Sequence, residues 1–279
     1  MCSPACLEFG RSALLETEIR GKNVLEVGAL DVNGSLRSFI ESHRPASYTG
    51  VDIAPGPGVD LLCDVTALID RFGRESADLV ICTEGLEHFL PWRMAVSHLK
   101  GVLATGGVLL VTTRSEGFPL HGFPYDFWRF SVGDIQAIFS DLIIERCEAD
   151  SDQPGVFFKA RRPASFREVS LAAHELYSIV RLRRIRDLEA SDLNVFHAIR
   201  QMYPDIFHLM DVWVRGGCGE LRPYPESALC PLCSAARAGE EIRALKDECN
   251  LLRRQLRDIE RSRVWRSAQA VRGLFGRRW

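Results

Sequence analysis

The chain of 279 residues is long enough for one domain with a substantial core and further segments beside it. Hydrophobic residues make up 46% and charged residues 26%, which excludes a wholly disordered or disulfide-stapled chain. The formal net charge is −2, but residues 261–279 hold six arginines and no acid, so residues 1–260 carry −8. Nucleic-acid-binding domains present a basic surface, so this acidic balance predicts that there is no nucleic-acid partner.

Two further properties predict a cytoplasmic location. No segment reaches the roughly 18 apolar residues of a membrane-spanning helix, and no basic stretch followed by an apolar run opens the chain. The nine cysteines are an odd number, and three of them stand singly within apolar runs: Cys63, Cys82 and Cys147. Reduced thiols are the simpler interpretation.

Residues 23–162, which follow an N-terminal segment of residues 1–22, alternate β-branched runs with helical patterns. This alternation predicts a parallel sheet covered by helices. Ser131 and Asp134 have the spacing of a helix-capping box. The last two strands are expected to form a hairpin, because a polar stretch with Pro154 joins them. Strands are predicted at 23–28, 47–52, 59–63, 77–82, 107–113, 141–146 and 155–161, and helices at 35–43 and 92–103 and from Ser131.

A helical extension is predicted for residues 163–215, where apolar residues recur at helical intervals among many charges. Residues 216–235 form a loop rich in Cys and Pro. Its Cys230 and Cys233 have the spacing of half a zinc site, and Cys218 precedes them. Because no second close pair follows, we interpret them as structural thiols and expect no metal.

Residues 236–262 carry apolar residues at alternating steps of three and four, the pattern of a coiled-coil seam. An isolated helix of this length is marginal, so a partner helix and a homo-oligomer are expected. Residues 263–279 form a basic amphipathic tail. Contact with an anionic membrane surface and packing beside the coiled coil remain equal alternatives for it. The seam consists of Ile242, Leu245, Cys249, Leu252, Leu256 and Ile259, and the apolar face of the tail of Val264, Trp265, Ala268, Val271 and Phe275.

The first chemical signal lies where the strand of residues 23–28 ends. Glu26 precedes a turn at Gly28, and a helix start follows. In open α/β sheets, ligands bind beyond the carboxyl ends of the strands, where glycine lets the backbone approach closely. A dinucleotide fingerprint requires a further glycine where Leu30 stands, so a dehydrogenase is disfavoured.

Two more acids follow the next strands. Asp52 lies where a carboxylate accepts hydrogen bonds from both ribose hydroxyls, and Asp64 with Val65 lies where an adenine ring is held. Three acids around one ligand suit a cationic cofactor better than one bearing phosphates. S-Adenosylmethionine meets this description.

Four motifs in this order resemble the class I S-adenosylmethionine-dependent methyltransferases, and in particular the bacterial group similar to the type 11 enzymes. They lie at residues 26–37, 50–60, 83–88 and 112–131. The resemblance covers residues 20–162. It implies a Rossmann-like α/β fold, a seven-stranded sheet with one antiparallel edge strand, to which this chain adds the C-terminal α-helical and coiled-coil extension. Leu30 departs from the glycine of many class members, and the loop from Asp31 to Gly34 is expected to compensate.

The resemblance also implies site residues. The turn after the first strand would line the methionine part of the cofactor, Asp52 the ribose, Asp64 and Val65 the adenine, and residues 84–88 the floor beside the methyl group. The cofactor-binding residues implied are Glu26, Gly28, Ala29, Asp31, Asn33, Gly34, Asp52, Ile53, Asp64, Val65, Glu84, Gly85 and His88.

A base is needed only when the acceptor must lose a proton. His88 is the first candidate, because imidazole titrates near neutral pH, with His121 and Asp126 as further catalytic candidates. An equal alternative is that His88 only supports a neighbouring carboxylate. Tyr125, Trp128 and Arg129 are predicted to bind the acceptor from a loop covering it; otherwise this aromatic segment merely plugs the end of the sheet.

The predicted reaction is O-methylation of a small hydroxylated acceptor. Ser262-Arg-Val-Trp-Arg266 after a coiled coil resembles the tails of bacterial surface-glycan enzymes, which implies a glycan acceptor at the inner face of the membrane. A different small acceptor, such as a quinone precursor or an amine, and a non-catalytic scaffold held by the coiled coil are the alternatives.

Overall fold

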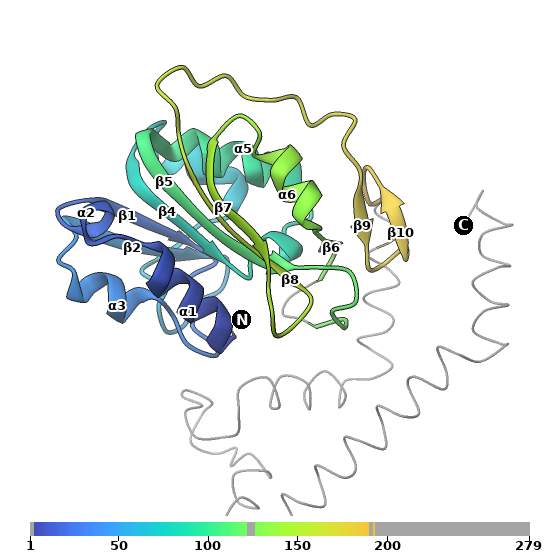
Figure 1. The fold of residues 1–279 in the computed structure, drawn as a ribbon, viewed down its shortest axis with the longest axis horizontal. Helices are drawn as coiled ribbons and strands as arrows, with labels where there is room; N and C mark the ends of the chain where they lie inside the picture. Colours follow the sequence, from blue (N-terminus) through green and yellow to red (C-terminus); the bar gives the residue numbers. More distant parts are fainter. Residues whose placement is uncertain (1–2, 122–125, 190–191, 193–279) are drawn as a thin grey trace, which may run out of the picture. The chain divides into compact units, whose positions relative to one another are not determined.

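The computed structural model describes residues 3–121, 126–189 and 192. A twisted seven-stranded sheet forms its centre, in the order β3-β2-β1-β4-β5-β8-β7 (Figure 1). The strands are β1 (Asn23–Val27), β2 (Ser47–Asp52), β3 (Leu61–Leu62), β4 (Ala77–Thr83), β5 (Leu103–Arg114), β7 (Ile143–Ala149) and β8 (Gly155–Arg161). The first five are parallel, which confirms the predicted sheet.

The antiparallel strand is β8, and it is not the outermost one. The β7–β8 hairpin folds back so that β8 pairs with β5 over seven residue pairs, from Val108 with Arg161 to Arg114 with Gly155. This places β7 at the edge, parallel to β5. The resemblance therefore implied the right number of antiparallel strands, namely one. The hairpin places that strand between β5 and β7.

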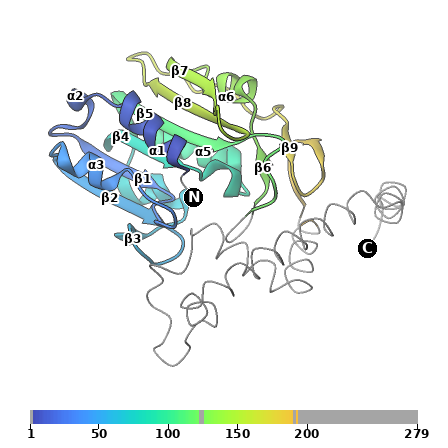
Figure 2. The ribbon, with the colours of Figure 1, turned by 60° about the horizontal axis from the view of Figure 1, so that its bottom comes forward.

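Helices cover both faces of the sheet (Figures 1 and 2). On one face lie α1 (Pro4–Ala13), α2 (Glu16–Ile19) and α3 (Arg37–Ser42), and on the other α4 (Leu68–Phe72), α5 (Trp92–Val102) and α6 (Val132–Ile138).

Alternation along the strands produces two separate hydrophobic cores, because successive side chains of a strand point to opposite faces. In β4, Leu79 and Ile81 pack toward α1 and α3, whereas Val80 and Cys82 pack toward α4 and α5. Each fully buried aliphatic side chain contributes roughly 1.5–3 kcal/mol. The continuous apolar runs of the sequence follow from burial on both sides.

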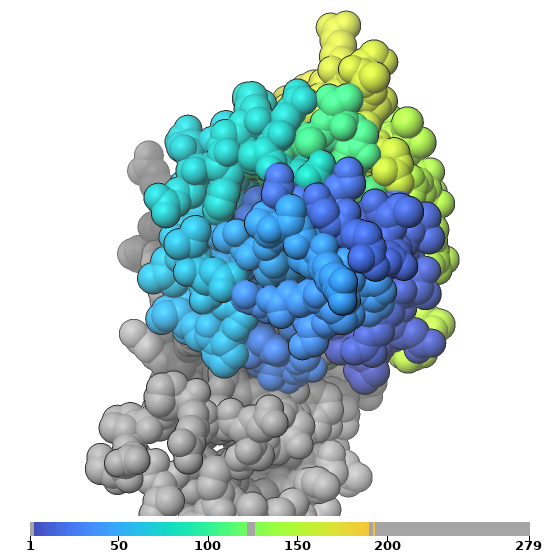
Figure 3. All heavy atoms as spheres, turned by 90° about the vertical axis from the view of Figure 1, so that its left-hand side faces the viewer, coloured from blue at the N-terminus to red at the C-terminus, as the bar shows by residue number. Residues whose placement is uncertain are grey.

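The N-terminal segment is part of this domain. Ser3 caps α1 by accepting a hydrogen bond from the Cys6 amide, and the Phe9 ring stacks on Phe157 of β8 at a centroid distance of 4.9 Å. Figure 3 shows how these first residues, in dark blue, continue into the surface formed by residues of β2 and its surroundings. Residues 3–22, for which the sequence predicted no role, thus complete one of the two cores.

Residues 163–189 are not helical, so the prediction of a helical extension is wrong for them. β9 (Leu176–Ser178) and β10 (Arg183–Ile185) join β6 (Trp128–Arg129) in a second, three-stranded sheet. The reason is tertiary: Arg93 of α5 donates hydrogen bonds to the carbonyls of Leu171, His174 and Arg186. These long-range bonds outweigh a local helical pattern.

The capping box at the start of α6 is present, and it also anchors this extension. Ser131 Oγ accepts from the Asp134 amide, while the Asp134 carboxylate accepts from the Ser131 amide. The same carboxylate is paired with Arg184 and lies 3.1 Å from His174 Nε2. Asp134 therefore links α6 to the second sheet.

The remaining predicted elements lie outside the described residues: the rest of the helical extension, the Cys/Pro loop of residues 216–235, the coiled coil and the basic tail. Among the helices that the structure does describe, none has the length and apolar content to cross a membrane.

Candidate active site

The predicted site residues gather at the carboxyl ends of β1, β2, β4 and β5. Gly28 follows β1 in the left-handed conformation (φ +80°), and a side chain there would meet only the Cα of Gly85, at 3.9 Å. Gly85 follows β4 and is confined, since a Cβ would lie 2.8 Å from Cys82 Sγ. The two glycines leave open backbone between the ends of β1 and β4, as close approach by a ligand requires.

The loop after β1 is held by its own polar groups. Asp31 Oδ1 accepts a hydrogen bond from the Gly34 amide at 2.7 Å, and Gly34 has φ +113°. Asn33 Oδ1 is buried and has no hydrogen-bond partner within the described part of the chain. Ala29 is buried, with its amide bound to the Val51 carbonyl, so it supports the loop. A hydrogen-bond donor on a ligand would satisfy the Asn33 oxygen.

Two of the three predicted acids along this edge, Glu26 and Asp52, lie in different environments. Glu26 is buried in β1 and accepts a hydrogen bond from the Tyr48 hydroxyl. Asp52 at the end of β2 accepts from the amides of Leu30 and Ala54, each at 3.1 Å. These bonds fix its carboxylate while leaving acceptor capacity on both oxygens.

Two predicted adenine contacts lie next to β3. The exposed Asp64 caps the 3₁₀ helix η1 (Val65–Ala67) by accepting from the Thr66 amide at 2.8 Å, and Val65 is buried. Ile53, which follows Asp52, is 55% exposed. An exposed apolar side chain directly after Asp52 suits contact with a flat ring.

The ends of β4 and β5 carry buried charges. Glu84 has φ +53°, its amide donates to the Thr112 carbonyl at 2.8 Å, and its carboxylate is paired with Arg114. Burial, together with the neighbouring Glu87 carboxylate, raises the pKa of Glu84 above its usual range. Arg114 is also 3.5 Å from Asp150, and its guanidinium lies over the Phe118 ring.

Glu87 and His88 follow on the 3₁₀ helix η2 (Leu86–His88). Glu87 is fully buried, and its Oε2 accepts a hydrogen bond from the Thr113 hydroxyl at 2.8 Å. Its other oxygen, Oε1, lies 3.9 Å from His88 Nε2 and 3.6 Å from His121 Nε2. Burial acts to raise the pKa of Glu87, but the two imidazoles hold it below its usual value.

His121 enters from the loop after β5 and completes this group. Its Nδ1 lies 3.0 Å from Asp126 Oδ2, and its amide donates to the same oxygen at 2.9 Å. The His88 and His121 rings meet edge to face with centroids 4.9 Å apart. Burial lowers the pKa of His88; burial also acts to lower that of His121, but Asp126 and Glu87 raise it.

The predicted acceptor-binding residues are placed differently from expectation. Trp128 is buried, and its indole N–H donates to the Phe89 carbonyl at 3.0 Å. Arg129 is also buried, and Nη2 donates to Asp126 Oδ2 at 2.6 Å. Both side chains were expected to contact an acceptor, but β6 turns them into the core, where Arg129 holds Asp126 and Trp128 binds the Phe89 carbonyl. Tyr125 lies outside the described residues.

Glu87 lay within the predicted floor of residues 84–88 but was not singled out, and Thr113 and Arg114, which contact this group, were not predicted. Glu87 stands in the motif of residues 83–88, directly before His88. Its place in that motif, shortly after the end of β4, is a usable signal. Nothing in the sequence, however, shows that Thr113 and Arg114 face Glu87 and Glu84, since those contacts arise from the pairing of β4 with β5.

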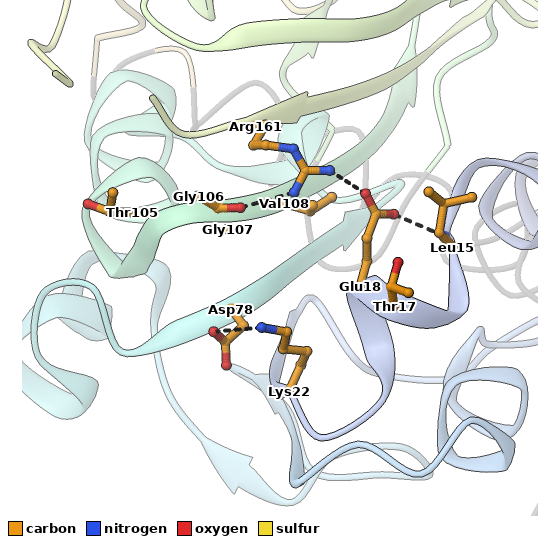
Figure 4. A pocket seen from close by; sticks show the side chains of 10 residues that line it. All are labelled: Leu15, Thr17, Glu18, Lys22, Asp78, Thr105, Gly106, Gly107, Val108 and Arg161. Atoms are coloured by element: carbon orange, nitrogen blue, oxygen red, sulfur yellow. Dashed lines mark hydrogen bonds and ion pairs between the residues drawn. The ribbon is translucent and has the colours of Figure 1, made fainter. Parts of the chain in front are cut away.

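A cavity lies at the opposite edge of the sheet, where the parallel strands begin. This cavity of about 250 Å³ is lined by residues near the beginnings of β4 and β5 and the end of β8 (Figure 4). Its charges already pair with each other: Arg161 with Glu18, and Lys22 with Asp78 at 3.9 Å. Ligands of open α/β sheets bind at the carboxyl ends of the strands, so this cavity is not the candidate site.

The residues present fit S-adenosylmethionine. The open glycine backbone at Gly28 offers room for it, the orphaned Asn33 oxygen needs a donor such as an amino group, and Asp52 retains acceptor capacity for hydroxyls. Acids rather than phosphate-binding amides dominate this edge, which favours a cation. Fold and site together define a methyltransferase of the S-adenosylmethionine-dependent class.

Comparison with known proteins leads to the same class. The model of a family described as a methyltransferase domain matches residues 7–188, so the chain belongs to this family. No curated protein matches the chain.

Three methyltransferases are among the similar solved structures. An S-adenosylmethionine-dependent methyltransferase from Mesorhizobium loti is 17% identical, with 57% of this chain and 98% of that one covered and a TM-score of 0.44. The 1,6-didemethyltoxoflavin N1-methyltransferase of Burkholderia thailandensis is 15% identical, with coverages of 57% and 80% and a TM-score of 0.46. The N-methyltransferase NodS of Bradyrhizobium japonicum is 17% identical, with coverages of 58% and 89% and a TM-score of 0.43.

Proposed function

We propose that this methyltransferase acts on a hydroxyl oxygen of a small acceptor. The observation that carries the proposal is the buried group of Glu87, His88 and His121, which we call the acceptor cluster. The cluster lies next to Gly85: the His88 amide donates a hydrogen bond to the Gly85 carbonyl at 3.0 Å. A hydroxyl must lose its proton during methylation, and basic atoms beside the methyl position favour that loss.

Two parts of the site, after β1 to β3 and after β4 and β5, have different roles in this proposal. When bound, S-adenosylmethionine supplies a methyl group on a positively charged sulfur. Gly28 and Asn33 would hold its amino-acid part and Asp52 its ribose, while Ile53 and Asp64 would border its adenine. Because Thr113 and Asp126 fix Glu87 and His121, the acceptor cluster meets an acceptor hydroxyl without rearranging.

The chemistry is tested by giving the purified protein radiolabelled S-adenosylmethionine and matched acceptor pairs, each an amino sugar and the corresponding neutral sugar, free and nucleotide-linked. We expect label on oxygen of the neutral sugar, located by mass spectrometry. Label on nitrogen alone would contradict methylation of a hydroxyl oxygen. Label on none of these sugars, with methylation of a phenolic or quinone-precursor acceptor instead, would contradict a sugar as the acceptor.

A glycan acceptor near the membrane is the finer proposal. It is supported by the resemblance of the tail, Ser262 to Arg266 and onward, to tails of surface-glycan enzymes, and by the arginines around its apolar face. Flotation with anionic and neutral vesicles tests the membrane contact. We expect the full chain to float with anionic vesicles and a chain ending at residue 262 to stay behind; equal behaviour of both would reject the contact.

We further propose that the heptad seam of residues 242–259 makes the protein a homo-oligomer. Light scattering should give a multiple of the chain mass for the full protein and the monomer mass for a chain ending at Ser234. An unchanged number of subunits after truncation would place the association elsewhere.

A further inference from the structure

The acceptor cluster has a geometry that hydrogen bonding does not explain. Glu87 Oε1 lies 3.6 Å from His121 Nε2 and 3.9 Å from His88 Nε2, and the potential ligand atoms of the three residues all lie within 4.8 Å of one another. A contact of 3.6 Å is too long for a hydrogen bond. Ligand atoms about 2.1 Å from one tetrahedral ion, in contrast, are roughly 3.4 Å apart.

Among the described residues, Glu87 Oε1 and His121 Nε2 have no hydrogen-bond partner, and these two atoms face each other. Thr113 occupies the second oxygen of Glu87, at 2.8 Å. Asp126, 3.0 Å from Nδ1 of His121, favours the proton on that nitrogen and leaves the lone pair on Nε2. A histidine oriented by a carboxylate through its other nitrogen is the usual arrangement at metal sites.

The way the buried carboxylates are neutralised is also compatible with a metal ion. The buried carboxylates of Glu84 and Asp126 are paired with Arg114 and Arg129, respectively. Glu87 is equally buried, but among the residues that the structure describes its charge partners are the imidazoles of His88 and His121, and not Lys or Arg. A metal ion between the three side chains would neutralise Glu87 without a protonated imidazole. A buried carboxylate is stable only when it is paired or coordinates a metal.

We infer that Glu87, His88 and His121 form a binding site for a divalent transition metal ion such as Zn²⁺. Two imidazoles and one carboxylate match the ligand set of zinc sites that keep a coordination position open. The proposal differs from the expectation of no metal, which considered only the cysteines. The ligands come from two separate segments, η2 and the loop after β5, which explains why no sequence motif announced them.

The role of the ion rests on the proposed function. A hydroxyl oxygen in the open coordination position would lose its proton more readily, because a bound cation lowers the pKa of the oxygen that it coordinates. Metal binding itself does not depend on which acceptor the enzyme uses, so the two proposals fail separately.

The test is calorimetric titration of the full chain, stripped with a chelator, with ZnCl₂ in the absence of cofactor and acceptor. We expect one site that Glu87→Gln weakens at least tenfold. Asp126→Asn, which changes a positioning residue, should weaken it by about 10- to 100-fold. His43→Ala, a histidine on the surface at the end of α3, is the matched control and should bind as the unaltered chain does.

Two measurements keep the inference falsifiable. Cys230→Ser combined with Cys233→Ser must leave the site intact, and Co²⁺ bound there must show no thiolate-to-metal absorption band. If Glu87→Gln does not fold by circular dichroism, His88→Gln replaces it, since that side chain is the least buried of the three. Unchanged Zn²⁺ affinity in the folded cluster variant, or binding that is lost with the cysteines, would overturn the metal site. Zn²⁺ binding without any oxygen methylation would leave the site standing and reject the proposed function.

Discussion

The two halves of the site use their acids in opposite ways. At the ends of β2 and β3, Asp52 and Asp64 are partly or fully exposed and bound to backbone amides. At the ends of β4 and β5, Glu84 and Glu87 are buried and meet charged side chains. Exposed acids fixed by the backbone are suited to hold a ligand, whereas buried charges gain strength from the low dielectric around them and are suited to chemistry. Under the proposed function, the first group forms the cofactor half of the site and the second the acceptor half.

The largest effect is expected in the acceptor half. His88→Ala should lower kcat by about 10²- to 10⁴-fold, the usual contribution of a group that assists proton loss. The affinity for S-adenosylmethionine, measured by calorimetry, should stay within about twofold, because the ring of His88 faces Glu87 and His121. A large loss of cofactor affinity without a loss of kcat would show that the two halves are not separate. His43→Ala is again the control.

A change in the cofactor half should have the reverse signature. Asp52→Ala is expected to weaken S-adenosylmethionine binding by about 2 kcal/mol, roughly 30-fold, because a charge-assisted bond to ribose is lost. At saturating cofactor, kcat should change little. Asp64→Ala is the matched comparison: its carboxylate is exposed, so its loss should weaken binding only severalfold. Equal affinities for the Asp52 variant and the unaltered protein would remove Asp52 from the cofactor site.

The smallest effect concerns stability and the anchoring of the extension beside the acceptor half. Burial acts to raise the pKa of Asp134, but hydrogen bonds from Arg184 and Ser131 lower it below its usual value. Asp134→Asn should therefore cost about 1–3 kcal/mol of unfolding free energy at pH 7.

The dependence of this difference on pH follows from the direction of the shift. A lowered pKa in the folded state adds stability that is fully present above the pKa of the unfolded chain, near 3.9, and is lost as the pH falls through the folded-state value. Urea unfolding at pH 7 and near pH 3 should show the difference shrinking. A constant difference would mean that the hydrogen-bond geometry, and not the charge, matters at Asp134.

Local pattern was sufficient for the sheet but not for the extension. The strands of residues 23–28, 77–82 and 155–161 were predicted within one residue at each end, because β-branched runs bounded by turn residues form strands in most contexts. Residues 166–189 also carry a periodic pattern, yet they fold into β9 and β10. Arg93 and Arg184, which hold them there, act across distances that periodicity does not describe.

The sequence by itself determined the fold of residues 23–162, the class of cofactor and the acids at the strand ends, since each depends on spacing along one segment. Only the tertiary structure decided which charges meet. It turned Trp128 and Arg129 inward, although both had been expected to face an acceptor. It also brought Glu87 of η2 against His121, 34 positions further on. Contacts between separate segments depend on the packing of the whole domain, which no short stretch of sequence contains.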